Sequence, residues 1–118
     1  MLQRLQWDLI LGSGHAISLL LAEMQDEDEL FASPNTRAHV EAELLAAART
    51  LAHLAPALRR RLVQVDWSGW QSLREALERG HRPRREAVWY GVRALMPATV
   101  HLLAEVRRRD PAGFEVGY

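Results

Sequence analysis

The chain has 118 residues, of which 48% are hydrophobic, a composition typical of globular rather than disordered proteins. The absence of cysteine excludes disulfide bonds and thiolate catalysis, and the longest apolar run is far shorter than the ~20 residues of a membrane span. Because the amino terminus also lacks a signal-peptide pattern, we expect one cytoplasmic domain over residues 1–118, with no membrane contact.

The zero net charge conceals an uneven distribution of charged residues. Residues 1–50 carry three Arg against eight acidic residues, whereas residues 51–118 carry twelve Arg against seven. All 15 basic residues are Arg, and three clusters at residues 59–61, 82–85 and 107–109 hold most of those in the second half. A guanidinium is a permanently charged fork of donors, so these clusters are either phosphate contacts or solvated helix surfaces.

The first helix is expected from about Leu2 to Met24, because its apolar residues recur in steps of three and four. These residues are Leu2, Leu5, Leu9, Gly12, Ala16 and Leu19. Gly12 and Gly14 lie in the middle, so either the helix bends there or another helix approaches closely. The apolar face from Leu5 to Leu19 exceeds what one small core covers, which predicts a C2 homodimer. The acidic stretch from Asp26 to Glu29 is expected to be a solvated loop.

A second helix is expected to begin at residues 33–36, where Ser33 and Pro34 are helix-start signals. Its apolar positions, again three and four residues apart, predict a stripe that faces the core. The stripe consists of Val40, Leu44, Ala47, Leu51, Leu54 and Leu58. Pro56 lacks a backbone donor, so the helix should kink there or restart as a short segment through Leu62.

Asp66 is expected to cap a third helix, which Gly80 ends. A basic loop at residues 81–84 follows, and the last helical region runs from about Arg85 to Arg108 with a kink or restart at Pro97. No segment shows the alternation of a strand. The predicted fold is therefore all-α, an up-and-down bundle of four to five helices.

Few residues are arranged to carry chemistry. There is no Gly-x-Ser-x-Gly motif. The chain has one Glu-x-x-His spacing, Glu78 to His81, and Gly80 is expected to break the helix inside it. His101 and Glu105 lie four residues apart on one helix face, but a metal site would need a second such pair. We therefore expect no metal or other cofactor. The remaining pair is Arg74 with His81. An imidazole can move the protons of RNA cleavage near neutral pH, and a guanidinium can hold the charge that builds on the phosphate oxygens.

An ordered series of short motifs runs from Phe31 to Val106. It comprises Phe31 and Thr36 before the long helix, Leu58-Arg59, Val65-Asp66-Trp67, Ser72-Leu73-Arg74-Glu75, Val88-Trp89 and Leu95-Met96-Pro97. In order and spacing, this series resembles the HepT-like branch of the HEPN family, small helical toxins encoded beside minimal nucleotidyltransferases.

The resemblance implies an HEPN-like helical dimer with a ribonuclease cleft between its protomers. The family signature is Arg, a polar residue, and His after four to six intervening residues, which Arg74, Glu75 and His81 match with six between. Arg74 and His81 would be the catalytic pair and Glu75 a supporting residue. The family often carries a Tyr two residues after the His. Here that position is Pro83, and the nearest tyrosine, Tyr90, is expected in the core.

Two functions from different classes follow from these observations. The first is a metal-independent endoribonuclease toxin, inhibited by an antitoxin of the minimal nucleotidyltransferase type. The neighbouring arginines are its candidate RNA contacts: Arg79, Arg82, Arg84 and Arg85. The alternative is a non-catalytic HEPN binding module that partners such a nucleotidyltransferase. A helical dimer without a role in nucleic-acid binding is a third hypothesis.

Overall fold

The computed structural model describes residues 2–22, 27–79 and 85–109, and every regular element in these ranges is a helix. The all-α prediction is confirmed for this part of the chain. None of these helices is long and apolar enough to cross a membrane. In chain order the elements are α1 (Leu2–Leu21), α2 (Glu27–Phe31), α3 (Pro34–Ala52), α4 (Pro56–Arg61), α5 (Trp67–Glu78), α6 (Arg85–Tyr90), the π-helix η1 (Gly91–Leu95) and α7 (Met96–Arg109).

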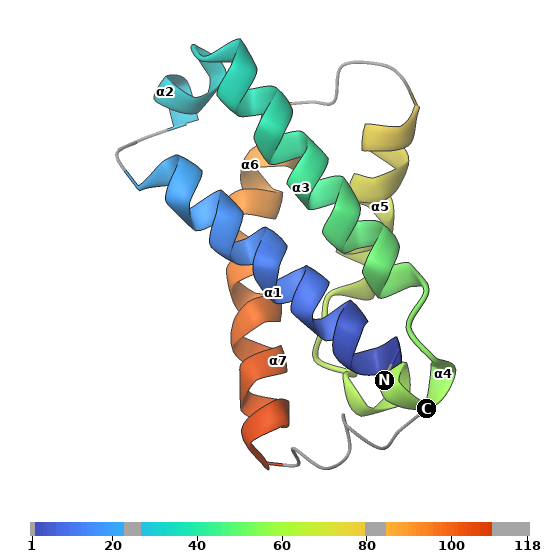
Figure 1. Cartoon of the computed structure of the whole chain (residues 1–118). Helices are drawn as coiled ribbons and strands as arrows, with labels where there is room; N and C mark the ends of the chain where they lie inside the picture. Colours follow the sequence, from blue (N-terminus) through green and yellow to red (C-terminus); the bar gives the residue numbers. More distant parts are fainter. Residues whose placement is uncertain (1, 23–26, 80–84, 110–118) are drawn as a thin grey trace.

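Helix α3 is central to the packing. It lies beside α1, which runs in the opposite direction, and it also packs against α5 (Figure 1). Elements α6, η1 and α7 follow one another as a single rod, of which α7 packs against α1 and η1 against α5. The six residues of the predicted core stripe of the second helix are all buried, none more than 4% exposed. Burial of such side chains stabilises the fold by about 1.5–3 kcal/mol each.

Helix α1 presents two apolar faces. Trp7, Ile10 and Ile17 are buried in the core, whereas Leu5, Leu9 and Leu19 are 56%, 61% and 64% exposed. Leu5, Leu9 and Leu19 of the predicted stripe therefore lie on a face that the core of this chain does not cover. The helix ends at Leu21 rather than at Met24, which lies outside the described residues.

The two glycines of α1 differ in their surroundings. A Cβ added at Gly14 would lie 2.7 Å from Cγ2 of Val100 on α7, whereas one added at Gly12 would meet nothing within 4 Å. Gly14 thus allows the close helix approach that was one of the two predicted alternatives. Gly12 faces open space within the exposed stripe.

The prediction of a loop from Asp26 to Glu29 is wrong for the described part, because Glu27–Phe31 forms α2. Leu30 is completely buried, and the Arg37 guanidinium lies 4.5 Å from the centroid of the Phe31 ring. These contacts hold the segment in a helical turn while its acidic side chains Asp28 and Glu29 remain in water. A single helical turn is too short to produce a visible apolar period.

The restart predicted at Pro56 is confirmed. Helix α3 ends at Ala52, and Pro56 occupies the first turn of α4, where the absent backbone donor breaks no intrahelical bond. Leu54 and Leu58 remain buried although the chain changes direction between them. The core stripe therefore continues across the break.

Asp66 caps α5 as predicted. Its Oδ1 accepts a hydrogen bond from the backbone N–H of Gly69 at 2.9 Å, which satisfies one of the free donors at the helix start. The helix ends at Glu78, with Arg79 as its C-cap. Gly80, the predicted end, lies outside the described residues.

In place of a break at Pro97, the last helical region contains a π-helical turn, since α6, η1 and α7 follow one another without interruption. The backbone N–H of Met96 donates to the carbonyl of Gly91, five residues earlier, and α7 begins at Met96. Gly91 is buried, and a Cβ there would lie 2.8 Å from Cδ2 of Leu73 on α5. The widened turn thus coincides with the point where α5 packs against this rod.

Candidate functional site

Arg74 borders a hollow of about 210 Å³ between α3, α4 and α5. Arg74 is half-buried, and its Nε is buried without a hydrogen-bond partner among the residues that the structure describes. The other residues that line the hollow are Ala48, Leu51, Ala52, Arg59, Trp67, Trp70 and Gln71. The cationic side chain of Arg74 therefore lies beside a hollow that Trp67 and Trp70 help to line, and this hollow is large enough for one small chemical group.

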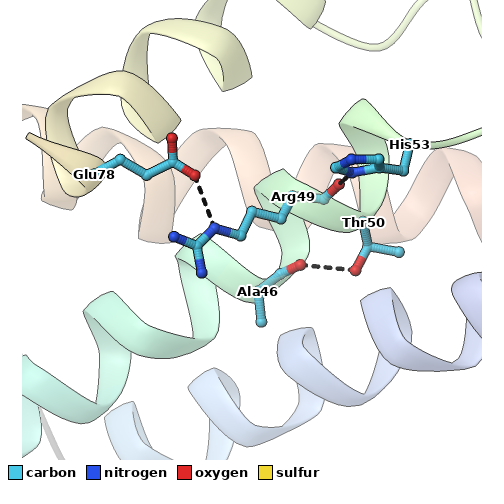
Figure 2. A network of polar contacts seen from close by, with 5 residues as sticks. All are labelled: Ala46, Arg49, Thr50, His53 and Glu78. Atoms are coloured by element: carbon cyan, nitrogen blue, oxygen red, sulfur yellow. Dashed lines mark hydrogen bonds and ion pairs between the residues drawn. The ribbon is translucent and has the colours of Figure 1, made fainter.

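Helix α5, which carries Arg74, is fixed at both ends. Near its start, the buried Trp70 donates through Nε1 to Thr99 Oγ1 on α7 at 2.9 Å. At its end, Glu78 accepts from Arg49 Nε on α3 at 2.7 Å, as Figure 2 shows. The hydrogen bond and charge of Arg49, with a smaller effect of Arg74, lower the pKa of Glu78 below its ordinary value. These contacts restrict where the Arg74 side chain can reach.

The network around Arg49 extends along α3. The carbonyl of Arg49 lies 2.7 Å from Nδ1 of His53, and Thr50 Oγ1 donates to the carbonyl of Ala46 at 2.7 Å (Figure 2). Nδ1 of His53 thus contacts a backbone carbonyl, and the residue lies on the exposed surface. This arrangement fits a structural histidine better than a proton carrier.

Three residues of the predicted site lie outside the described residues. They are His81, Arg82 and Arg84. The described part of the chain stops at Arg79, directly after α5, and resumes at Arg85. The approach of His81 to Arg74 stays a prediction.

The remaining predicted residues have partners within the chain. Glu75 is exposed, accepts from Gln71 Nε2 at 3.3 Å and lies 4.0 Å from the exposed guanidinium of Arg79. Arg85 pairs with Asp28 and stacks over Phe31 at 4.9 Å from the ring centroid, which joins α6 to α2. Of these two arginines, Arg79 is the more open to a ligand.

Sequence reasoning did not place Arg59 and Trp67 together. The Arg59 guanidinium lies 4.6 Å from the centroid of the Trp67 ring, and Trp67 Nε1 donates to the carbonyl of Leu62 at 3.0 Å. Both residues also line a second, more open hollow of about 470 Å³ with Pro56, Arg60 and Val63. The arginine cluster and the tryptophan are both visible in the sequence, but their contact depends on how the turn at residues 62–66 folds back.

Tyr90 is not in the core, contrary to the prediction. Its side chain is 49% exposed, and its hydroxyl donates to Asp66 Oδ2 at 3.0 Å. This bond and the negative charge of Asp66 raise the pKa of Tyr90 above its ordinary value. Val88 and Val92, two residues to either side, occupy the buried positions of this turn.

Another hollow, of about 530 Å³, lies between α1 and the rod of η1 and α7. Its lining includes Gly14, His15, Ser18, Arg93 and Met96. Within the described ranges, no three His, Asp or Glu side chains come together in a way that could hold a metal ion.

Comparison with known proteins adds no family assignment. No protein-family model, curated protein or solved structure matches the chain.

Proposed function

We propose that the chain is a metal-independent endoribonuclease of the HEPN type, with Arg74 and His81 as its catalytic pair at a cleft between two protomers. Its antitoxin partner would be a minimal nucleotidyltransferase. The observation that carries the proposal is Arg74, a half-buried arginine that borders a hollow and whose Nε has no hydrogen-bond partner among the described residues. A guanidinium group beside an open space is suited to the negative charge that develops on phosphate oxygens.

In this proposal the 2′-hydroxyl of one nucleotide attacks the adjacent phosphorus. The 2′-oxygen loses its proton, the bond to the 5′-oxygen breaks, and that oxygen takes up a proton as it leaves. The products are a 2′,3′-cyclic phosphate and a 5′-hydroxyl. His81 carries one of the two protons, because an imidazole changes its charge near neutral pH. Arg74 stabilises the negative charge on the non-bridging oxygens.

The proposed homodimer is supported by the exposed face of α1. Leu5, Leu9 and Leu19 are each more than half exposed, and Gly12 between them faces open space. Large exposed apolar side chains that form one stripe mark a surface suited to association. A second copy of the chain, with its own α1 stripe, would bury them across a two-fold axis.

The decisive test of the proposed pair is cleavage of single-stranded RNA by purified protein in EDTA. Arg74→Ala and His81→Ala should each lower the cleavage rate by a factor of about 10² to 10⁴, because each removes a group that acts in the transition state. Arg108→Ala is the matched control. This arginine is 71% exposed on α7 and pairs with Glu105, so its loss should leave the rate within about twofold of wild type.

Two outcomes would contradict the proposal. If both variants keep the wild-type rate, the cleavage does not depend on Arg74 and His81. If the wild-type protein is inert but binds a minimal nucleotidyltransferase encoded beside it, the chain is the non-catalytic module instead.

A further inference from the structure

Arg59 and Trp67 form a rim between two hollows. Arg59 lies in the last turn of α4, Trp67 begins α5, and the guanidinium stacks 4.6 Å from the ring centroid. Both residues line the hollow of about 210 Å³ that Arg74 borders and also the hollow of about 470 Å³ that Arg60 borders. The rim is therefore accessible from two adjacent spaces.

The charges around this rim favour an anionic ligand. Three guanidinium groups, those of Arg59, Arg60 and Arg74, line the two hollows, and no acidic residue is among their described lining residues. Arg59 and Arg60 are exposed, and the Nε of Arg74 has no hydrogen-bond partner within the described ranges. The Glu78 carboxylate, whose pKa Arg74 helps to lower, lines neither hollow, so phosphate oxygens would find permanent positive charge within them.

The apolar part of the rim favours a planar ring. The indoles of Trp67 and Trp70 wall the smaller hollow, and Gln71 adds an amide that can donate to or accept from a base edge. Nucleic-acid bases stack on tryptophan rings and on guanidinium planes, in a manner that tolerates any base. A volume of about 210 Å³ admits a single ring system rather than a duplex.

We propose that the Arg59–Trp67 rim binds one nucleotide of a single-stranded RNA, the nucleotide attached to the phosphate held by Arg74. The assignment of RNA as ligand rests on the proposed function. The base occupies the smaller hollow against the rim, and the neighbouring phosphate along the strand lies toward Arg60. This RNA contact is separate from the arginines at residues 79–85.

Binding is measured with a strand that cannot be cleaved, a fluorescein-labelled deoxyuridine octamer, by fluorescence anisotropy. Arg59→Gln should weaken binding by about tenfold, because it removes both a phosphate contact and the guanidinium that orders the indole. Arg108→Gln makes the same charge change on the exposed surface of α7 and should alter affinity less than about twofold. Trp67→Phe keeps an aromatic ring in the wall and should weaken binding less than Trp67→Ala, provided that circular dichroism shows both variants folded.

Competition by small ligands shows whether the base or the phosphate contributes more to binding. It also shows whether the site prefers a strand to a free nucleotide. Uridine monophosphate should compete with the octamer more weakly than unlabelled octamer does, and uridine or ribose 5-phosphate more weakly still. The inference is overturned if Arg59→Gln and Arg108→Gln have the same affinity for the octamer, as expected for a rim that contacts a protein. It is also overturned if uridine monophosphate binds as tightly as the octamer, which would identify a site for free nucleotides.

The two proposals fail in different ways. If Arg59→Gln weakens octamer binding while His81→Ala leaves cleavage unchanged, the rim binds a strand and the proposed ribonuclease pair is wrong. If cleavage requires Arg74 and His81 but Arg59→Gln changes neither octamer affinity nor KM, the ribonuclease stands and the rim is not its subsite.

Discussion

Asp66 is the residue on which three local contacts converge. Its carboxylate accepts from the backbone N–H of Gly69, from the Tyr90 hydroxyl and, at 3.3 Å, from Ser68 Oγ. The hydrogen bonds from Gly69 and then Tyr90 hold its pKa below the ordinary value of 3.8. One exposed side chain thus starts α5 and joins it to α6.

These bonds predict a pH dependence of stability. Because the folded pKa of Asp66 lies below the unfolded one, its contribution is fully present above pH 3.8 and is lost as the pH falls through the folded value. Asp66→Asn keeps a good N-cap without the charge, so its free energy of unfolding should fall less steeply than that of wild type below about pH 4. Urea titrations across this range measure the slope. Parallel curves for wild type and variant would contradict the assignment.

Arg74 could be singled out from the sequence, but the hollow beside it and the neighbouring Arg59–Trp67 stack could not. Arg74 stands out because it follows the buried Leu73 and matches a motif. The hollow beside it depends on three helices that meet only after the chain has turned at Pro56 and at Asp66. The stack of Arg59 on Trp67 has no local signature, since seven residues that include a turn lie between the two.

Among the elements, those with a long apolar period or a strong terminal signal were predictable. The core stripe of α3, the restart at Pro56 and the cap at Asp66 follow from periodicity and backbone chemistry that act within a few residues. Helix α2 and the π-helix η1 depend instead on tertiary contacts. Leu30 of α2 is buried in the core, and Gly91 of η1 lies against Leu73, and neither contact can be read from the local sequence.

The crossing of α1 and α7 yields a prediction at this scale. Gly14→Ala should destabilise the fold by about 1–3 kcal/mol, because the new Cβ would lie 2.7 Å from Cγ2 of Val100 and must displace it. Helix propensity alone would predict a gain of about 1 kcal/mol. In a Val100→Ala background the same substitution should be tolerated, and urea unfolding of the four proteins gives the coupling energy. An equal loss in both backgrounds would show that the close contact is not the cause.

At the scale of the whole molecule, the proposed dimer explains the uncovered stripe of α1. The chain has a mass of 13.4 kDa, so light scattering after size exclusion should give about twice that value for the wild type. Leu9→Glu places a charge at a position that is 61% exposed in one chain and buried in the proposed dimer, and it should yield a monomer. Val63→Glu is the control, since Val63 is 75% exposed but lies off α1.

Leu9→Glu also tests whether the two protomers share one active cleft. No described residue of α1 lines the hollow beside Arg74, so Leu9→Glu changes association without touching that hollow. If the cleft forms between two chains, the monomeric variant should lose cleavage along with the dimer. A monomer that cleaves at the wild-type rate would place a complete site in each chain.

The activity that we propose for this chain is cleavage of RNA by attack of a 2′-hydroxyl, with Arg74 and His81 as the catalytic groups. Mass spectrometry of the products from a short single-stranded RNA, incubated with purified protein in EDTA, tests it most directly. We predict 5′ fragments that end in a 2′,3′-cyclic phosphate and 3′ fragments that begin with a 5′-hydroxyl, both absent with Arg74→Ala or His81→Ala. Fragments with a 5′-phosphate and a 3′-hydroxyl, or unchanged products from the two variants, would contradict it.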